Sequence, residues 1–404
     1  MSKKSPQLRF KGFTDAWEER KLSELIQKGG SGGTPKSTNK TYYDGDIPFL
    51  GISDISKSNG YIDDTEKHIS EKGLNNSSAW IVPKGAISLA MYASVGKLAI
   101  LNTDAATSQA FYNMVFEYES IRDYVYHRLG RANDLGEWTK LISTGTQANL
   151  NADKVKNFEI QVPQSIDEMK DISTFFNQLD IFITLQQRKL DLLKEQKKGY
   201  LQKMFPKNGE KIPELRFAGF ADDWEERKLK DIAQFNPKTV LPDEFEYVDL
   251  ESVVGTEMIS HRTESKDQAP SRAQRLAQKG DVFYQTVRPY QMNNYLYDLP
   301  YDNYVFSTGY AQMRPNIDSY FLLNSVQNKQ FVQHVLDRST GTSYPAINSS
   351  DLSNIEIHVP SKLSEQQKIG AFFQSIDDTI TLHQRKLDLL KEQKKGYLQK
   401  MFAK

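Results

Sequence analysis

The feature that most constrains this fold is an internal duplication. LRFKGFTDAWEERKL at residues 8–22 returns as LRFAGFADDWEERKL at 215–229, and QRKLDLLKEQKKGYLQKMF occurs at both 187–205 and 384–402. A weaker match pairs STGTQANLNADKVKNFEIQVP from Ser143 with STGTSYPAINSSDLSNIEIHVP from Ser339. Because a sequence repeat reflects a structural unit used more than once, we expect two similar units with the same framing segments.

Between these shared ends, the interiors of the two units differ. GGTPKSTNKTYYDGDIPFLGISDI in the first has no recognisable counterpart in FNPKTVLPDEFEYVDLESVVG of the second. Drift after duplication is one explanation. However, drift would also erode the frame, and the 19 residues of the longer repeat are identical in both copies. We therefore favour interiors that perform different versions of one task.

Length and composition narrow the class of protein. At about 150 residues per domain, 404 residues suggest two or three domains. The absence of cysteine excludes disulfides and thiolate metal sites. The first residues lack the apolar run of a signal peptide, and the most apolar stretch, 81–101, is interrupted by Lys84 and Lys97. We expect a cytoplasmic protein without a membrane segment.

The longer repeat lies within a heptad pattern that predicts two long helices of about 38 residues each. Apolar residues recur every seven positions, and a second series follows four residues after the first, which is typical of a coiled-coil seam. The series are Ile172, Leu179, Gln186, Leu193 and Tyr200 with Phe176, Ile183, Leu190, Lys197 and Met204, and Ile369, Ile376, His383, Leu390 and Tyr397 with Phe373, Ile380, Leu387, Lys394 and Met401. The polar members of the two series are expected to set the register of the helices. Two similar units joined by such helices also suggest a pseudo-two-fold axis, which is the symmetry of duplex DNA.

No enzymatic motif is recognisable. The chain has no P-loop, no GxGxxG and no Asn-Pro-Pro-aromatic string, and its six histidines are scattered without metal-ligand spacing. Pro242-Asp243 with Glu251 superficially resembles a nuclease site but lacks the Glu-x-Lys that should follow. We therefore predict no catalytic residues and no metal site.

The distribution of charge argues against a broad basic surface. The 52 Lys and Arg balance the 52 Asp and Glu. Each copy of the longer repeat has six basic and two acidic residues, whereas residues 234–360 have ten basic and fifteen acidic. Because DNA-binding proteins usually neutralise phosphates with Lys and Arg, any nucleic-acid surface in the second unit must be a local patch.

Several strings resemble one known family. GGTP at Gly32–Pro35 is followed by YYDGDIPFLGISDI, TSQAF begins at Thr107, and both helices end in the form LxxLKxQKKGxLQKMF. Together with the duplicated frame, these strings make essentially the whole chain similar to the specificity subunits of type I restriction-modification systems. The resemblance implies an α/β (α+β) fold with two pseudo-symmetric target-recognition domains separated by two long antiparallel coiled-coil helices.

With that resemblance, the chain divides into five segments. The first target-recognition domain, with the N-terminal repeated segment, is predicted at 1–163, the central helix at 164–206, a linker at 207–214, the second target-recognition domain at 215–360 and the C-terminal helix at 361–404.

The resemblance also implies a function and partners. Each domain would read one half of a gapped, asymmetric target on double-stranded DNA, with the halves about one turn apart. The helices would hold two methyltransferase subunits, and restriction/translocase subunits would add cleavage. S-adenosylmethionine, ATP and Mg²⁺ would bind to those partners, which could also supply most phosphate contacts. One alternative is a coiled-coil interaction protein whose domains bind protein or sugar. The other is a self-contained DNA enzyme, and the missing catalytic motifs argue against it.

Polar side chains on loops are the candidates for reading base edges. In the first domain they are Lys36, Ser37, Asn39, Lys40, Tyr92, Ser94, Gln109, Gln147 and Asn149. In the second domain they are Arg262, Arg272, Arg275, Arg288, Tyr290, Gln291, Asn293, Asn294 and Tyr344. The alternative for each is a solvated loop residue. Trp17 and Trp224 belong to the repeated frame, so we expect them in the core.

Overall fold

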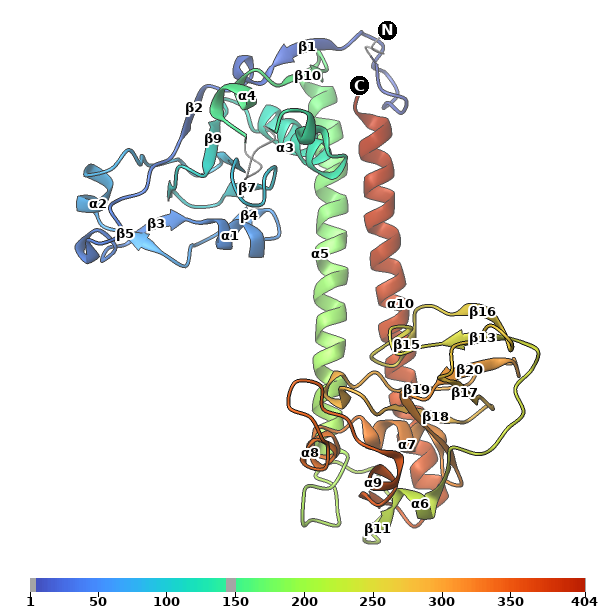
Figure 1. Cartoon of the computed structure of the whole chain (residues 1–404). Helices are drawn as coiled ribbons and strands as arrows, with labels where there is room; N and C mark the ends of the chain where they lie inside the picture. Colours follow the sequence, from blue (N-terminus) through green and yellow to red (C-terminus); the bar gives the residue numbers. More distant parts are fainter. Residues whose placement is uncertain (1–4, 143–149, 404) are drawn as a thin grey trace. The chain divides into compact units, whose positions relative to one another are not determined.

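The computed structural model describes residues 5–142 and 150–403, and it has the predicted mixed α/β fold with two units and two long helices (Figure 1). Unit 1 comprises residues 1–188 and 385–404, and unit 2 comprises residues 189–384. Each unit therefore contains part of both long helices. Unit 1 is discontinuous in sequence, and the bounds of the five predicted segments stay a prediction.

The two long helices are α5 (Ile166–Lys203) and α10 (Leu363–Met401). The predicted seam positions are buried or partly buried, except Tyr397, which is more exposed. In unit 1, Phe176 near the start of α5 stacks on Phe402 just beyond α10. In unit 2, Phe205 just beyond α5 packs on Phe373 near the start of α10. The helices are thus antiparallel within each unit, as predicted.

Two of the polar seam residues form equivalent ion pairs. In unit 1 the Lys394 Nζ lies 2.5 Å from the Asp180 Oδ1, and in unit 2 the Lys197 Nζ lies 2.6 Å from the Asp377 Oδ1. Both pairs join α5 to α10 and are partly buried. Because a charge in such a seam is tolerated only opposite its partner, these pairs favour one register of the antiparallel helices.

The repeated N-terminal segments form the same two-stranded ladder in both units. Strand β1 (Glu18–Lys21) pairs antiparallel with β10 (Glu159–Val162), and β11 (Glu225–Lys228) pairs with β22 (Glu356–Val359). The registers match, because Glu18 lies opposite Val162 and Glu225 opposite Val359. Sequence identity in the frame is therefore accompanied by identical strand pairing.

Buried charge anchors this segment to the start of each long helix. The Arg9 Nε donates to the Glu168 Oε1 at 2.6 Å, and the Arg216 Nε donates to the Glu365 Oε1 at 2.7 Å. The two carboxylates are only 1% and 2% exposed. A buried carboxylate without its cation is costly, so these pairs hold the N-terminal segment of each unit in place.

The interiors contain the larger sheets. In unit 1 a five-stranded sheet has the order β2-β9-β6-β7-β4 and a smaller one the order β5-β3-β8. The strands are β2 (Lys28–Ser31), β3 (Ile47–Leu50), β4 (Tyr61–Ile62), β5 (His68–Ile69), β6 (Ile87–Ala90), β7 (Leu98–Leu101), β8 (Ala106–Thr107) and β9 (Phe111–Val115). The accompanying helices are α1 (Ile52–Lys57), α2 (Glu71–Asn75), α3 (Glu119–Asp134) and α4 (Ala152–Lys156).

Unit 2 has two four-stranded sheets, β12-β21-β18-β19 and β16-β13-β20-β17, and the hairpin β14-β15. The strands are β12 (Ala233–Phe235), β13 (Glu244–Val248), β14 (Val253–Val254), β15 (Glu257–Met258), β16 (Arg262–Ser265), β17 (Ala273–Leu276), β18 (Val282–Gln285), β19 (Tyr295–Leu296), β20 (Tyr304–Ser307) and β21 (Tyr310–Pro315). The helices are α6 (Leu229–Ile232), α7 (Ser319–Val326), α8 (Lys329–Asp337) and α9 (Ser349–Ser353).

The two interiors share an order of strands in their sheets that their sequences do not reveal. The order β2-β9-β6-β7 in unit 1 corresponds to β12-β21-β18-β19 in unit 2. The parallel pair β3 and β8 likewise corresponds to the parallel pair β13 and β20. Different sequences therefore occupy one topology, which places the connecting loops of the two units at equivalent points.

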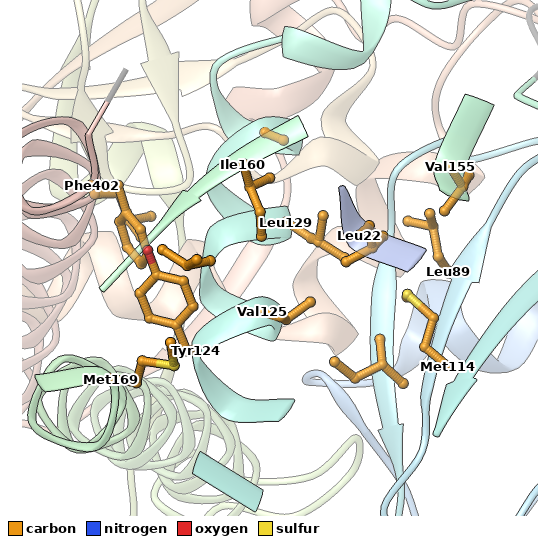
Figure 2. Packing of buried hydrophobic residues seen from close by; sticks show 14 of the residues in the cluster. Leu22, Leu89, Met114, Tyr124, Val125, Leu129, Val155, Ile160, Met169 and Phe402 are labelled. Atoms are coloured by element: carbon orange, nitrogen blue, oxygen red, sulfur yellow. The ribbon is translucent and has the colours of Figure 1, made fainter. Parts of the chain in front are cut away.

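Each core is completed by the last residues of one copy of the longer repeat. Figure 2 shows Tyr124, Val125 and Leu129 of α3 among the buried residues of unit 1, with Phe402 beside Tyr124. The two rings lie 5.3 Å apart. Trp17 and Trp224 are each 1% exposed, which confirms the prediction that they are core residues.

Gly32 allows the segment after β2 to approach β8 closely. A Cβ at Gly32 would lie 2.0 Å from the Thr107 carbonyl oxygen, and the Gly33 amide donates to that oxygen at 2.9 Å. Real Cβ atoms do not come this close to backbone, so any larger residue would displace the segment. The glycines of GGTP thereby determine where Thr34 and Lys36 lie.

We predict that Gly32→Ala lowers the free energy of unfolding by roughly 1–3 kcal/mol, because the added methyl group overpacks the contact with Thr107. Amide exchange at Gly33 should accelerate as its hydrogen bond lengthens. The matched control is Gly130→Ala in α3, where no atom lies within 4 Å of the new Cβ; alanine there should leave stability unchanged or raise it. Equal effects of the two substitutions in urea unfolding would contradict this account.

His127 makes the stability of unit 1 sensitive to acid. Burial lowers the pKa of His127 from 6.5 to about 4, although Asp180 opposes the shift. The ring Nε2 lies 2.8 Å from the Asn177 Oδ1, and Lys394 and Asp123 also act on it. Because the folded-state pKa lies below the unfolded value, the neutral ring stabilises the fold fully above pH 6.5, and this contribution is lost as the pH falls toward 4.

We expect unit 1 to lose roughly 3 kcal/mol from this histidine between pH 6.5 and 4. Urea unfolding followed by tryptophan fluorescence across that interval measures the loss, and His127→Gln should show a shallower decline over the same interval. The same slope in both proteins would show that His127 is not the titrating group.

Candidate nucleic-acid interface

In each unit, some of the polar candidates lie on or beside one loop of the main sheet. Loop L1 (residues 91–97) joins β6 to β7, and loop L2 (residues 286–294) joins β18 to β19. These strands are equivalent in the two sheets. L1 and L2 therefore occupy the same position in their units while sharing no sequence pattern.

The same neighbours flank both loops. In unit 1 the Met91 amide donates to the Ala110 carbonyl at 2.7 Å, and the Leu150 amide donates to the Met91 carbonyl at 2.9 Å. In unit 2 the Thr286 amide donates to the Gly309 carbonyl at 2.9 Å, and the Ile347 amide donates to the Thr286 carbonyl at 3.0 Å. Each loop thus lies between the turn that leads into β9 or β21 and the segment that follows the STGT string.

In unit 1 the structure brings several candidates together. The Thr34 hydroxyl donates to the Gln109 Oε1. Tyr92 is exposed on L1 and follows Met91, whose amide donates to the carbonyl of Ala110, the residue after Gln109. The Ser94 hydroxyl lies 3.3 Å from the Ser56 hydroxyl. Thr34 was not among the predicted residues, although GGTP had been singled out, because its contact with Gln109 depends on tertiary structure.

The remaining candidates of unit 1 lie after Thr34 or beyond the described chain. Lys36, Ser37 and Lys40 are exposed. Asn39 is partly buried and caps a short 3-10 helix, because its Oδ1 accepts from the Thr41 amide at 3.2 Å. Gln147 and Asn149 lie outside the described residues.

In unit 2 the centre of the cluster is Arg288. Its amide donates to the Pro345 carbonyl at 2.8 Å, and its guanidinium lies over the Tyr344 ring, 4.6 Å from the centroid. Tyr290 is exposed, and the Gln291 Oε1 accepts from the buried Gln285 Nε2 at 2.8 Å. Four candidates from two separate segments therefore share one surface.

Other candidates of unit 2 have partners within the fold. The Asn293 Oδ1 accepts from the Gly255 amide at 2.8 Å. Asn294 is 1% exposed, and its Oδ1 accepts from the Gln285 amide at 2.8 Å. These contacts give both asparagines a role in shaping L2.

The other three arginines differ from Arg288 in their surroundings. Arg262 of β16 forms 2.8 Å ion pairs with Asp249 and Glu264. Arg275 of β17 is half-buried, and desolvation lowers the pKa of its guanidinium. Arg272 is exposed, and its carbonyl accepts from the Thr308 amide beside the turn that contacts L2.

Backbone strain marks the same regions. Among the described residues other than glycine, those with positive φ are Ala93 and Ser94 in L1, Arg288 and Met292 in L2, and Asn236 just after β12. Side chains disfavour this conformation, and it persists only where surrounding contacts impose it, often at functional sites. The Asn236 side chain supplies such contacts, because it accepts from the Gln312 amide and donates to the Ser349 hydroxyl.

The chemistry available to this interface is hydrogen bonding and aromatic contact. Within residues 5–142 and 150–403, no group of three His, Asp or Glu side chains is arranged to hold a metal ion. Over the same residues, no helix combines the length and the apolar character needed to span a membrane. Arg, Gln, Ser and Tyr side chains on rigid loops are suited to reading hydrogen-bonding groups of a polar ligand.

Comparison with known proteins identifies the family. The model of the type I restriction modification DNA specificity domain matches residues 14–195 and again 221–392. The type I restriction enzyme MjaIX specificity subunit of Methanocaldococcus jannaschii is 30% identical over 181 residues, or 44% of this chain and 41% of the relative. The HindI specificity subunit of Haemophilus influenzae is 26% identical over 176 residues, or 40% and 37%. The matched segments thus span about two fifths of these relatives.

Solved structures share the fold over a greater length. The type I restriction-modification S subunit from M. genitalium superposes with a TM-score of 0.64 at 14% identity, covering 99% of both chains. A chain from a study of complex assembly and conformational transition of the type I system gives a TM-score of 0.55 at 17% identity, covering 95% of this chain and 97% of that one. With two copies of the family domain over most of its length, the chain belongs to the type I restriction-modification DNA specificity family.

Proposed function

We propose that this chain is the sequence-reading subunit of a type I restriction-modification complex. Unit 1 reads one half of a gapped, asymmetric target on double-stranded DNA, and unit 2 reads the other half about one helical turn away. The chain carries out no catalysis itself. The long helices hold two methyltransferase subunits and, by joining the units, set the spacing of the half-sites.

The observation that carries this proposal is the equivalence of L1 and L2. Both loops leave equivalent strands, both are flanked by the same neighbours, and both contain strained residues, yet their side chains differ. A duplicated reader of two different half-sites requires such a combination, because the frame must be the same and the contacts must differ. Drift alone gives no reason for positive φ at residues other than glycine in both loops.

Partner subunits complete the proposal. S-adenosylmethionine belongs to the methyltransferase subunits, and ATP and Mg²⁺ belong to the restriction/translocase subunits. Several basic side chains of unit 2 are already paired with carboxylates, as Arg262 is with Asp249 and Arg314 with Asp281. The chain therefore supplies base contacts, and its partners supply most of the phosphate contacts that give affinity.

Single-molecule methylome sequencing tests this function. Cells expressing the chain with its cognate methyltransferase are compared with cells expressing the methyltransferase alone. We expect chain-dependent methylation at one gapped, asymmetric motif. If the complex forms stably but no chain-dependent methylation is found, the proposal is wrong, and the chain is instead an interaction protein whose domains bind another partner.

A further inference from the structure

We infer that Arg288 reads a guanine in the half-site contacted by unit 2, with Tyr344 holding the guanidinium in the reading position. This inference rests on the proposed function and assigns one base class to one residue. It depends on three properties of Arg288: its unpaired donors, its contact with an aromatic ring and its fixed backbone.

The donors of Arg288 are available. No hydrogen bond or ion pair within the described residues uses its guanidinium, and its side-chain contact is the ring of Tyr344. Arg262 and Arg314 on the same unit each form ion pairs with buried or half-buried carboxylates at 2.8 Å. Unlike these two, Arg288 can offer its donors to a ligand without breaking a charge pair.

The contact with Tyr344 leaves those donors accessible. The guanidinium carbon lies over the Tyr344 ring, and no hydrogen bond of the described residues uses the N–H groups. Arg288 itself is partly exposed. Tyr344 is itself 64% exposed, so this pair lies at the surface. Stacking restricts a flexible side chain and thereby lowers the entropy that binding would otherwise cost.

The backbone of L2 is fixed before any ligand binds. Arg288 has φ of 55° and ψ of 54°, is followed by Pro289, and donates its amide to the Pro345 carbonyl. Beneath it, the buried Gln285 Nε2 donates to the Val287 carbonyl at 2.6 Å and to the Gln291 Oε1 at 2.8 Å. A left-handed residue held by such contacts has a fixed direction of its Cα–Cβ bond, and the ring of Tyr344 then contacts the end of the side chain.

Guanine is the base that fits these donors. Its major-groove edge offers two adjacent acceptors, N7 and O6, and arginine binds both through two parallel N–H groups. A phosphate could also accept from arginine, but an arginine whose backbone is held by Pro345 and whose guanidinium lies on Tyr344 is suited to a ligand at one defined position. L1, at the equivalent place in unit 1, contains Lys97 but no arginine. The half-site of unit 1 is therefore read with different donors.

The test uses the wild-type complex and two variants. First, each guanine in the half-site of unit 2 is replaced in turn by 7-deazaguanine, which lacks the N7 acceptor. One replacement should weaken binding of the wild-type complex by roughly 5-fold or more. This experiment does not depend on whether any variant folds.

Next, Arg288→Ala should relax the motif at that same base pair, with discrimination falling roughly 5- to 150-fold, while the other half-site stays unchanged. Tyr344→Ala should reduce discrimination at the same base pair, and Tyr344→Phe should retain it. Arg338→Lys is the matched control, because the Arg338 guanidinium donates to the His334 carbonyl at the end of α8; it should leave the motif unchanged.

Three results would overturn the inference. They are a unit 2 half-site without a G·C pair, full tolerance of 7-deazaguanine at every position, and a uniform loss of methylation by Arg288→Ala with an unchanged motif, which indicates a phosphate contact. In each case the wild-type chain still directs methylation to a gapped motif. Failure of that methylation would instead defeat the proposed function, and this inference with it.

Discussion

The fold depends on the way each unit is closed by the end of a long helix. The Leu8 amide donates to the Lys400 carbonyl in unit 1, and the Leu215 amide donates to the Lys203 carbonyl in unit 2, both within 2.9 Å. Phe402 and Phe205 enter the respective cores beside these hydrogen bonds. The repeated segments therefore meet at both helix ends, which gives a physical reason for their identity: each must fit the same partner surface.

This arrangement separates what must stay constant from what can change. Buried ion pairs such as Arg9–Glu168, and seam pairs such as Lys394–Asp180, tolerate little substitution because each charge needs its partner. L1 and L2, by contrast, are connections between strands, and side chains such as Tyr92 and Tyr290 are exposed there. If the proposed function holds, new residues in these loops alter binding without disturbing the frame.

Sequence patterns predicted the parts of the fold that depend on local or repeated signals. The heptads located both long helices, and the repeated tryptophans were correctly expected in the core. The matching sheets were missed, because strand pairing joins residues far apart in sequence and different side chains can satisfy one ladder. The partners of Arg262 and the burial of Asn294 were likewise invisible, since both depend on tertiary neighbours. Whether the surface candidates contact DNA stays a prediction.

If the two units read their half-sites independently, exchanging the interior of one unit should change one half-site alone. Residues 23–163 would be replaced by the corresponding segment of another family member, and the methylated motif would be determined beside that of the parent chain. We expect a new sequence in one half-site, with the other half-site and the gap preserved. Changes in both half-sites would show that the units do not read independently and would contradict the account.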